Sequence, residues 1–208
     1  MTPPKPRHFS MLREFRVADA FTLLNGFAGT GAVLAFMRYL LDRDQSFFWI
    51  GAALLPVALL MDVLDGRIAR HRGEVSPLGQ ELDSLADIVS FGVAPAAMAF
   101  AAGFRGGWDA LCLMSFVGCG ISRLARYNVT AATLAERTGK VTYFEGLPIP
   151  SSLLLVALLA ALAGAERWQD DLPLGVLELG PVTLHPLVLV FVLHGSAMVS
   201  KTLRVPKP

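Results

Sequence analysis

The segment DVLDGRIARHRGEVSPLGQELDSLAD, residues 62–87, determines both the fold and the chemistry expected of this chain. It carries four aspartates in two pairs and lies between stretches that are apolar enough to enter a lipid bilayer. One charged side chain in the middle of a membrane costs about 2.5–3.5 kcal/mol on insertion scales. Acids at such a depth therefore require a cation, an arginine or a water-filled cavity beside them. The four aspartates are Asp62, Asp65, Asp83 and Asp87.

The spacing within this segment places the acids on two helix faces. Each residue turns a helix by about 100°, so residues three, four or seven positions apart lie on one side. The first face holds Asp62, Asp65, Gly66 and Ala69, and the second holds Gly79, Asp83 and Asp87. Because Gly73 and Pro77 mark a turn between the two faces, the segment predicts a helical hairpin.

Two acidic faces that meet in such a hairpin form a site rich in carboxylate oxygens. Oxygen ligands of this kind suit a hard divalent cation. Gly66, Ala69 and Gly79 keep side-chain bulk off the same faces, so a flat group or a phosphate chain can approach the backbone. A purely structural alternative pairs the aspartates with the arginines of the turn. Pairing alone does not explain the small residues, and ionisable residues inside a membrane are functional by default.

The motif D-x-x-D-G-x-x-A-R, then eight residues, then G-x-x-x-D-x-x-x-D runs from Asp62 to Asp87. It resembles the signature of the CDP-alcohol phosphatidyltransferase family at each of its eight fixed positions. The resemblance implies an all-α fold, a polytopic membrane bundle of six transmembrane helices that forms a single domain over residues 1–208. It also implies Mg2+ or Mn2+ as the cofactor, with two divalent ions, and a homodimer.

The same resemblance implies roles for individual residues. Asp62, Asp65 and Asp83 are expected to bind the metal, and Asp87 is expected to act as the catalytic base and as a ligand of the second ion. The residues expected to shape the pocket for the CDP group are Gly66, Ala69, Arg70 and Gly79. Arg70 suits the phosphates because a guanidinium can form two parallel bonds to an oxyanion.

Some polar groups inside the apolar runs carry a weaker signal. Asn25 lies near the cytoplasmic end of the first run, and we expect it to touch the nucleotide. An ordinary hydrogen bond between two spans would explain Asn25 equally well. Cys112 and Cys119 lack any metal-binding spacing, so we expect them to be packing thiols.

The composition is that of a membrane protein. The 208 residues are 54% hydrophobic and 17% charged, with a mean hydropathy of +0.54. The net charge of +1 provides no basic field that would recruit nucleic acid. Each apolar stretch approaches the roughly 20 residues that a bilayer requires. We expect spans near residues 21–41, 47–72, 79–102, 108–128, 148–165 and 183–203.

The segments between the spans are expected to be polar loops, and Pro95 is expected to kink the third span. The longer loops are residues 129–147 and 166–182, of which the second is acidic. Residues 1–16 are basic with apolar residues at helical spacing, which predicts a short amphipathic segment on the membrane surface. A loose basic tail would fit these residues equally well.

The distribution of basic residues orients the spans. Of the eighteen lysines and arginines, fourteen lie in the N-terminal segment, the motif turn, the 123–140 region and the C-terminal tail. The other four are Arg38, Arg43, Arg105 and Arg167. The positive-inside rule then places both termini and the acidic site on the cytoplasmic side of the inner cell membrane. A water-soluble nucleotide can reach a site on that side.

Three further stretches bear on the acceptor alcohol: LADIVSFGVAP at 85–95, ISRLARYN at 121–128 and YFEGLPIP at 143–150. They resemble the phosphatidylserine synthase branch of the family. The resemblance implies transfer of a phosphatidyl group from CDP-diacylglycerol to L-serine, with release of CMP.

Serine carries a carboxylate and an ammonium, and the same stretches contain side chains that match both. Arg123 or Arg126 would bind the carboxylate, Glu145 would bind the ammonium, and Asn128 would hold either end. Both arginines would serve equally well to bind the phosphate of the lipid or the membrane surface.

Other functions use similar residues. Within the family, the acceptor alternatives are glycerol phosphate, inositol phosphate and choline, and the donor alternative is an archaeal CDP-lipid. Membrane prenyltransferases also bind a metal diphosphate with aspartates, but they lack the spacing from Gly66 to Arg70. A divalent-cation transporter would need a continuous polar path, and the apolar stretches before Met61 and beyond Phe91 give little sign of one.

Overall fold

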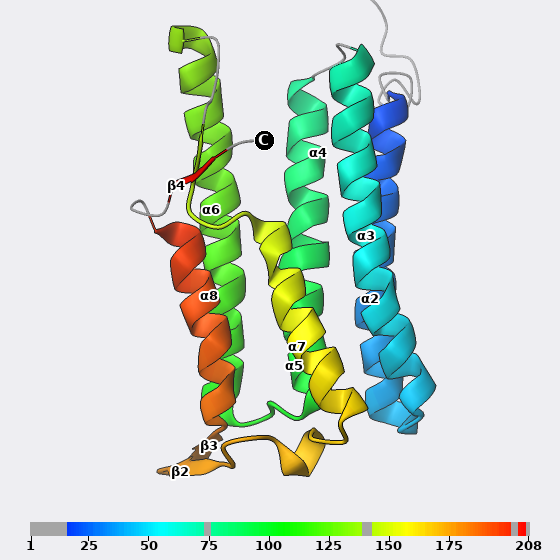
Figure 1. Ribbon diagram of the computed structural model, residues 1–208, viewed down its shortest axis with the longest axis vertical. Helices are drawn as coiled ribbons and strands as arrows, with labels where there is room; N and C mark the ends of the chain where they lie inside the picture. The colour runs from blue at the N-terminus through cyan, green and yellow to red at the C-terminus, as the bar shows by residue number, and fades with distance from the viewer. Residues whose placement is uncertain (1–15, 73–75, 139–142, 201–203, 207–208) are drawn as a thin grey trace, which may run out of the picture.

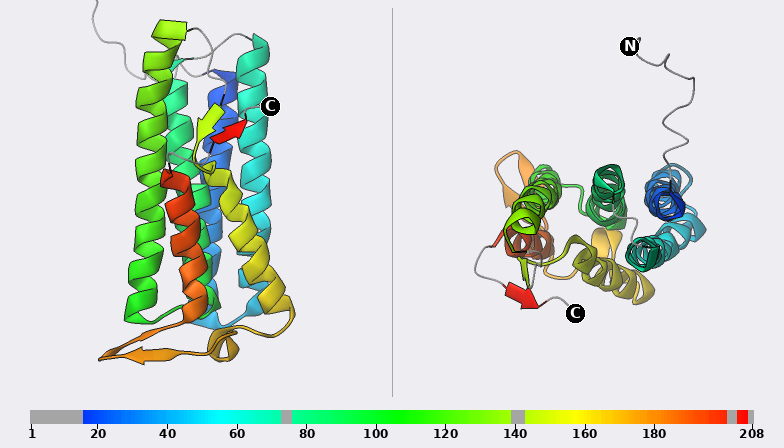
Figure 2. Two further views of the ribbon diagram at one scale, coloured as in Figure 1. Left: turned by 60° about the vertical axis from the view of Figure 1, so that its left-hand side comes forward. Right: turned by 90° about the horizontal axis from the view of Figure 1, so that it is seen from above.

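The computed structural model describes residues 16–72, 76–138, 143–200 and 204–206, and for residues 77, 130–145 and 204–206 it describes the backbone only. Long helices run side by side along the molecule, and short strands lie between their ends (Figure 1). The view along the bundle shows the helices grouped around a common interior (Figure 2). The mostly helical architecture confirms the all-α expectation.

The first two spans form an antiparallel pair. Helix α2 (Val17–Asp42) and helix α3 (Gln45–Arg72) are joined by Arg43 and Asp44. Arg43 has the left-handed φ of 57° that ends many helices, and its N–H donates to the Tyr39 carbonyl at 2.8 Å. Both helices begin earlier than the expected spans, by four residues in α2 and by two in α3.

The third span is one rod made of three segments. Helix α4 (Pro77–Asp87) begins at Ser76, whose hydroxyl accepts a hydrogen bond from the Gly79 N–H at 2.9 Å. A π-helical turn, η1 (Ile88–Val93), follows, and helix α5 (Ala94–Ala102) completes the rod. The irregularity expected at Pro95 therefore starts directly after Asp87. π-turns inside helices are frequently found at functional sites.

Helix α6 (Gly107–Thr138) corrects one prediction. The fourth span was expected over residues 108–128, which agrees with the apolar segment Gly107–Val129, but a loop was expected over 129–147. The helix instead continues for ten further residues, because Ala, Leu, Glu and Arg in this segment are strong helix formers whether or not a membrane surrounds them. Strand β1 (Tyr143–Glu145) then pairs antiparallel with β4 (Arg204–Pro206).

The last third of the chain differs from a second prediction, the loop expected over residues 166–182. The short helix η2 (Ile149–Ser152) leads into α7 (Leu153–Gly164), and η3 (Gln169–Asp171) follows. Strands β2 (Leu177–Leu179) and β3 (Val182–Leu184) form a hairpin. The final helical segment consists of η4 (Pro186–Val188) and α8 (Leu189–Val199).

This hairpin occupies residues that were expected to be loop and the start of the sixth span. Gly180, with a φ of 70°, forms the turn, and apolar residues alternate on both sides of it. A period of two is the pattern of a strand. The helix therefore begins at Pro186 rather than at residue 183.

Among the described residues, four helical segments are long and apolar enough to cross a membrane. They are Val17–Asp42, Gln45–Arg72, Leu78–Ala102 and Gly107–Val129. Ile149–Gly164 and Pro186–Val199 are apolar but shorter. The chain is thus a helical protein embedded in a membrane. The expected amphipathic segment, residues 1–16, lies outside the described residues apart from Arg16.

The two ends of the bundle differ. The α2–α3 connection and the β2–β3 hairpin lie at one end, and the end of α3 and the start of α4 lie at the other (Figure 1). Trp168 stacks on Tyr39 with ring centroids 5.6 Å apart and packs against Phe48 at the hairpin end. Gln169 donates hydrogen bonds to the Tyr39 hydroxyl and to the Ala101 carbonyl. These contacts join α2, α3 and α5 at the end remote from the motif.

Candidate active site

The two acidic faces meet near the end of the bundle opposite the hairpin. One carboxylate oxygen from each of Asp62, Asp83 and Asp87 lies within 4.8 Å of the other two. Asp62 comes from α3, and Asp83 and Asp87 come from α4 on successive turns. The predicted helical hairpin therefore brings both helices together at their acids, although residues 73–75 of its turn lie outside the described residues.

The donor set of this cluster fits a hard divalent cation. All three residues offer carboxylate oxygens, and Asp83 Oδ1 is buried without a hydrogen-bond partner. In the described part of the chain, no ion pair joins these aspartates to Arg67, Arg70 or Arg72. The purely structural alternative, charge pairing within the motif, is therefore not what the side chains do. An uncompensated group of buried carboxylates needs a positive partner.

Asp65 has a different environment from the other three aspartates. Its side chain is 5% exposed, and the Thr22 hydroxyl donates to its Oδ2 at 2.7 Å. Asp65 thus lies on the α2 side of the cluster, next to the three-carboxylate group that Asp62, Asp83 and Asp87 form. Asp62, Asp65 and Asp83 were expected to bind the metal, whereas the three carboxylates that converge here are those of Asp62, Asp83 and Asp87.

Asn25 reaches the cluster from α2. Its Nδ2 donates to Asp87 Oδ1 at 3.1 Å, and its own Oδ1 is buried without a partner. The hydrogen bond between spans that was expected as the alternative for Asn25 is therefore present, and it ends on a carboxylate of the candidate site. The contact with a nucleotide stays a prediction. Asp87 is 7% exposed, so this amide is a large part of its surroundings.

The small residues of the motif have distinct environments. A Cβ added at Gly66 would meet nothing within 4 Å, so this face of α3 is open. A Cβ at Gly79 would lie 3.0 Å from Asp19 Oδ1 and 3.0 Å from Ser76 Oγ. Ala69 is half-buried, and Arg70 is exposed in the last turn of α3. Gly66 therefore leaves room beside the acids, and Arg70 places a cation at the end of the same helix.

The four residues expected to bind serine or a lipid phosphate have separate positions. Arg123 is 8% exposed, its Nε has no partner, and its guanidinium lies 5.7 Å from the Tyr127 ring. Arg126 instead donates to the Val199 carbonyl at 3.3 Å and so joins α6 to the end of α8.

Asn128 and Glu145 complete that set. Asn128 Nδ2 donates to Ser84 Oγ at 3.0 Å, which joins α6 to α4 one residue after Asp83. Glu145 belongs to strand β1, and its side chain lies outside the described residues. Arg123 is therefore the member of the set that is buried with unused hydrogen-bonding capacity.

Several residues around the site were not predicted from the sequence. Asp19 and Thr22 are both 4% exposed, and together with Asn25 they recur at steps of three along α2. Asp19 Oδ2 accepts a hydrogen bond from the Arg16 N–H at 2.8 Å. The signal was present in the sequence, because three polar residues on one face of an apolar span indicate a buried polar contact.

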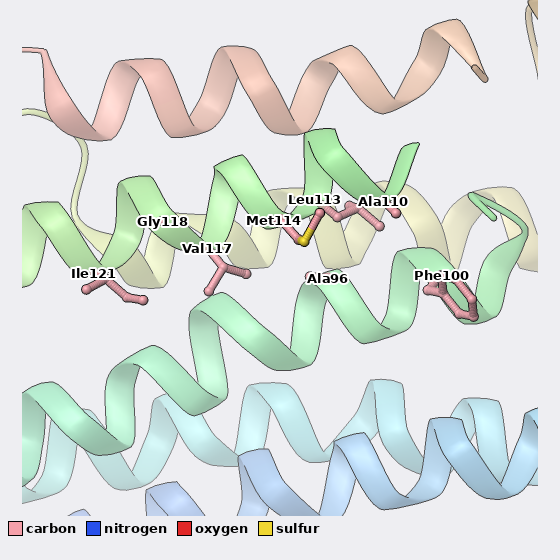
Figure 3. Close-up of a pocket in the computed structure, with 8 residues that line it drawn as sticks. All are labelled: Ala96, Phe100, Ala110, Leu113, Met114, Val117, Gly118 and Ile121. Atoms are coloured by element: carbon pink, nitrogen blue, oxygen red, sulfur yellow. The ribbon is translucent and has the colours of Figure 1, made fainter. Parts of the chain in front are cut away.

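An apolar groove lies apart from the acidic cluster. It runs between α5 and α6 with a volume of about 420 Å³ (Figure 3). It is lined by Ala96, Phe100, Ala110, Leu113, Met114, Val117, Gly118 and Ile121. None of these side chains carries a charge, so the groove offers no group for nucleotide or metal chemistry.

The fold and the site define a class of protein, and comparison with known proteins gives the same class. The chain belongs to the CDP-alcohol phosphatidyltransferase family, whose model matches residues 15–196. The CDP-diacylglycerol–serine O-phosphatidyltransferase of Saccharomyces cerevisiae is 46% identical over 204 residues, which are 97% of this chain and 74% of that protein.

Two other relatives carry the same name. The protein from Methanocaldococcus jannaschii is 35% identical over 148 residues, which are 71% of this chain and 62% of the relative. The protein from Mycobacterium leprae is 39% identical over 172 residues, which are 80% of this chain and 54% of the relative. The similarity thus extends across a eukaryote, an archaeon and a bacterium, and the relatives are longer than the matched region.

Proposed function

We propose that this protein transfers a phosphatidyl group from CDP-diacylglycerol to L-serine and releases CMP. The observation that carries the proposal is the convergence of Asp62, Asp83 and Asp87, whose carboxylate oxygens lie within 4.8 Å of one another on the family's motif. The names of the relatives support serine as the acceptor. The reaction class follows from the site, and the choice of alcohol follows from the similarity.

The reaction exchanges one phosphorus–oxygen bond for another. The serine hydroxyl oxygen bonds to the phosphorus that carries the diacylglycerol group. The bond from this phosphorus to the bridging oxygen of the diphosphate breaks, and CMP leaves with that oxygen. The hydroxyl proton passes to Asp87, which acts as the general base. Asn25 donates to one oxygen of Asp87, and this bond would orient the carboxylate for the role.

Asp62, Asp65 and Asp83 would hold a Mg2+ or Mn2+ ion, and Asp87 would contribute to a second ion. When bound, the cation would neutralise the charge that develops on the diphosphate. Gly66, Ala69, Arg70 and Gly79 would form the CDP pocket, as the family resemblance implies. The open space at Gly66 and the exposed guanidinium of Arg70 support this assignment.

The acceptor pocket is proposed to lie against α6. Arg123 would bind the serine carboxylate, because it is buried and its Nε lacks a partner. Glu145 would bind the ammonium. Arg126 and Asn128 connect helices in this structure, and they would shape the pocket or contact the lipid phosphate from those positions.

The proposed arrangement in the membrane has six spans in one domain. The shorter helical segments over residues 149–164 and 186–199 lie alongside the longer helices (Figure 2) and would be the fifth and sixth spans. The uneven distribution of Lys and Arg along the sequence supports a cytoplasmic position for the site and both termini, in an inner cell membrane. A homodimer is proposed from the family resemblance alone.

A CMP-release assay tests this function. The purified protein in detergent is given CDP-diacylglycerol, Mg2+ or Mn2+, and one alcohol at a time from serine, glycerol phosphate, inositol phosphate and choline. We expect CMP release to depend on serine and on the metal. Strong release with inositol phosphate and none with serine would reassign the acceptor. Replacing the donor by an archaeal CDP-lipid measures the alternative for the lipid tail.

A further inference from the structure

Helix α2 contributes two buried polar side chains that end on acids of other helices. Thr22 donates to Asp65 on α3 at 2.7 Å, and Asn25 donates to Asp87 on α4 at 3.1 Å. The two donors are one helical turn apart, so they lie on one face of α2. Helix α2 supplies no ligand of the expected metal, yet it holds Asp65 from the acidic face of α3 and Asp87 from the acidic face of α4.

The Thr22 hydroxyl lies near two acceptors, and the distances show which one it binds. It has one proton to donate, and it lies 2.7 Å from Asp65 Oδ2 but 3.3 Å from the Ala18 carbonyl of its own helix. A hydrogen bond to a carboxylate is shorter and about twice as strong as one between neutral groups. The hydroxyl therefore serves Asp65 rather than the backbone of α2.

The backbone of α2 is fixed directly beside Asp87. A Cβ at Gly29 would lie 2.7 Å from Ser90 Cα, and the Ser90 hydroxyl donates to the Asn25 carbonyl at 3.0 Å. A Cβ at Gly26 would lie 3.6 Å from the Cβ of Ala86, the residue before Asp87. These contacts set the register of α2 against α4 and η1, so the Asn25 amide meets Asp87 without depending on its own hydrogen bond for placement.

We infer that Thr22 and Asn25 are positioning residues for the divalent cation site. Each occupies one oxygen of an aspartate, Oδ2 of Asp65 and Oδ1 of Asp87, and leaves the second oxygen of that carboxylate for the cation. This inference rests on the proposed function, because it assumes that the cluster binds a metal. Groups that orient metal ligands typically alter metal affinity by about 10–100-fold when they are removed.

The test measures metal binding without turnover. Mn2+ is titrated into the purified full-length protein in detergent, without CDP-lipid or serine, and free Mn2+ is followed by electron paramagnetic resonance. Thr22→Val keeps the shape of the side chain and removes its hydroxyl, and we expect it to weaken Mn2+ binding about tenfold or more. Thr22→Ser keeps the hydroxyl and should bind Mn2+ as the wild type does. Thr30→Val makes the same change on the exposed side of α2 and should have no effect.

Asn25 is separated from a nucleotide contact by the same titration, which contains no nucleotide. In Asn25→Leu, the loss of the donor to Asp87 should weaken Mn2+ binding. Unchanged Mn2+ affinity in the folded variant, together with a raised KM for CDP-diacylglycerol, would instead identify Asn25 as a nucleotide contact and overturn its positioning role.

The outcomes for Thr22 distinguish this inference from the proposed function. Equal Mn2+ affinity in the wild type and in a folded Thr22→Val variant would overturn the role of Thr22 while the metal site stands. Absence of Mn2+ binding in the wild type would overturn the metal site and this inference with it. If Thr22→Val does not purify as a folded protein, Thr22→Ala and Thr22→Ser make the same comparison. Weakened binding in the alanine variant alone supports the inference, and equal binding in both overturns it.

Discussion

The proposed chemistry depends most directly on Asp87, the general base. Asp87→Asn keeps the size of the side chain but removes the site for the proton. We expect CDP-lipid binding to survive and turnover to fall by about 10²–10⁴-fold, the range that a general base typically contributes. CMP release and a direct CDP-lipid binding measurement check the two parts separately. Turnover at the wild-type rate would remove Asp87 from the role of base.

Arg123 and Arg126 form a natural pair for testing the acceptor pocket. Arg123 is buried and its Nε has no partner, whereas Arg126 is bonded to the Val199 carbonyl. Loss of a hydrogen bond to a charged group costs about 1.5–3 kcal/mol. We therefore expect Arg123→Gln to raise the KM for serine by about 10–100-fold, which is that cost at RT of about 0.59 kcal/mol.

The matched change at Arg126 separates binding from packing. Arg126→Gln should lower the melting temperature in detergent and leave the KM for serine close to that of the wild type, because its hydrogen bond joins α6 to α8. A larger KM effect at Arg126 than at Arg123 would exchange the two assignments. Steady-state CMP release at varied serine concentration gives both values.

At the same scale, the sequence reveals some site residues more easily than others. Asp62, Asp83 and Asp87 are predictable because charges in an apolar segment are conspicuous and their spacing fixes the helix face. Thr22 is harder to recognise, because a threonine in an apolar helix can satisfy its hydroxyl on its own backbone. Only the packing of α2 against α3 shows that this hydroxyl meets Asp65.

At the scale of elements, the contact between α2 and η1 places the site. Gly29→Ala should disturb it, because the added Cβ would lie 2.7 Å from Ser90 Cα, a backbone atom that cannot rotate away. Overpacking of this kind typically costs about 1–3 kcal/mol. We expect a lower melting temperature together with reduced turnover, since α2 would move away from Asp87.

A second glycine provides the control for this change. A Cβ at Gly118 in α6 would meet nothing within 4 Å, and alanine favours helix more than glycine does. Gly118→Ala should therefore leave the melting temperature and turnover unchanged or slightly improved. Equal losses in both variants would show that the approach of α2 to Ser90 is not special. Thermal unfolding and CMP release are measured on the same preparations.

The helices were predictable where the length of an apolar run determines them. Elements that depend on local conformational preference were less predictable. The first three spans follow from runs of apolar residues that a bilayer requires. The continuation of α6 to Thr138 depends on helix propensity in a polar segment, and the strands Leu177–Leu179 and Val182–Leu184 depend on a short alternating pattern. The π-turn after Asp87 has no sequence signal beyond Pro95, because it arises from the packing of the rod against its neighbours.

At the scale of the whole molecule, the two ends of the bundle are built differently. The end that holds the β2–β3 hairpin is closed by hydrogen bonds between elements. Among the described residues, four side chains have a buried polar atom without a partner: Asn25 and Asp83 in the acidic site, Arg123 on α6 and Ser152 in η2. Buried polar groups are usually satisfied. The unsatisfied atoms of Asn25 and Asp83 therefore mark the acidic end as the one at which a ligand is expected to complete the structure.

Asp109 lies at the closed end, where the β2–β3 hairpin is. Replacing it tests whether this end serves stability rather than substrate binding. It is fully buried and accepts hydrogen bonds from the Gly106 N–H at 2.8 Å and the His185 N–H at 2.8 Å, and His185 Nδ1 lies 2.6 Å from its Oδ2. Asp109→Ala leaves these groups without a partner, at about 1–3 kcal/mol each. We expect the melting temperature in detergent to fall by several degrees, while the KM values for CDP-lipid and serine stay unchanged in the protein that remains folded.

Asp42 supplies the comparison at the same end of the bundle, because its ion pair with Arg38 is solvent-exposed. Exposed pairs contribute about 0–1 kcal/mol, so Asp42→Ala should hardly change the melting temperature. If Asp109→Ala instead raised the KM for either substrate at an unchanged melting temperature, the two ends would be coupled in catalysis. The closed end would then belong to the working site rather than to the framework that holds α6 and α8 in place.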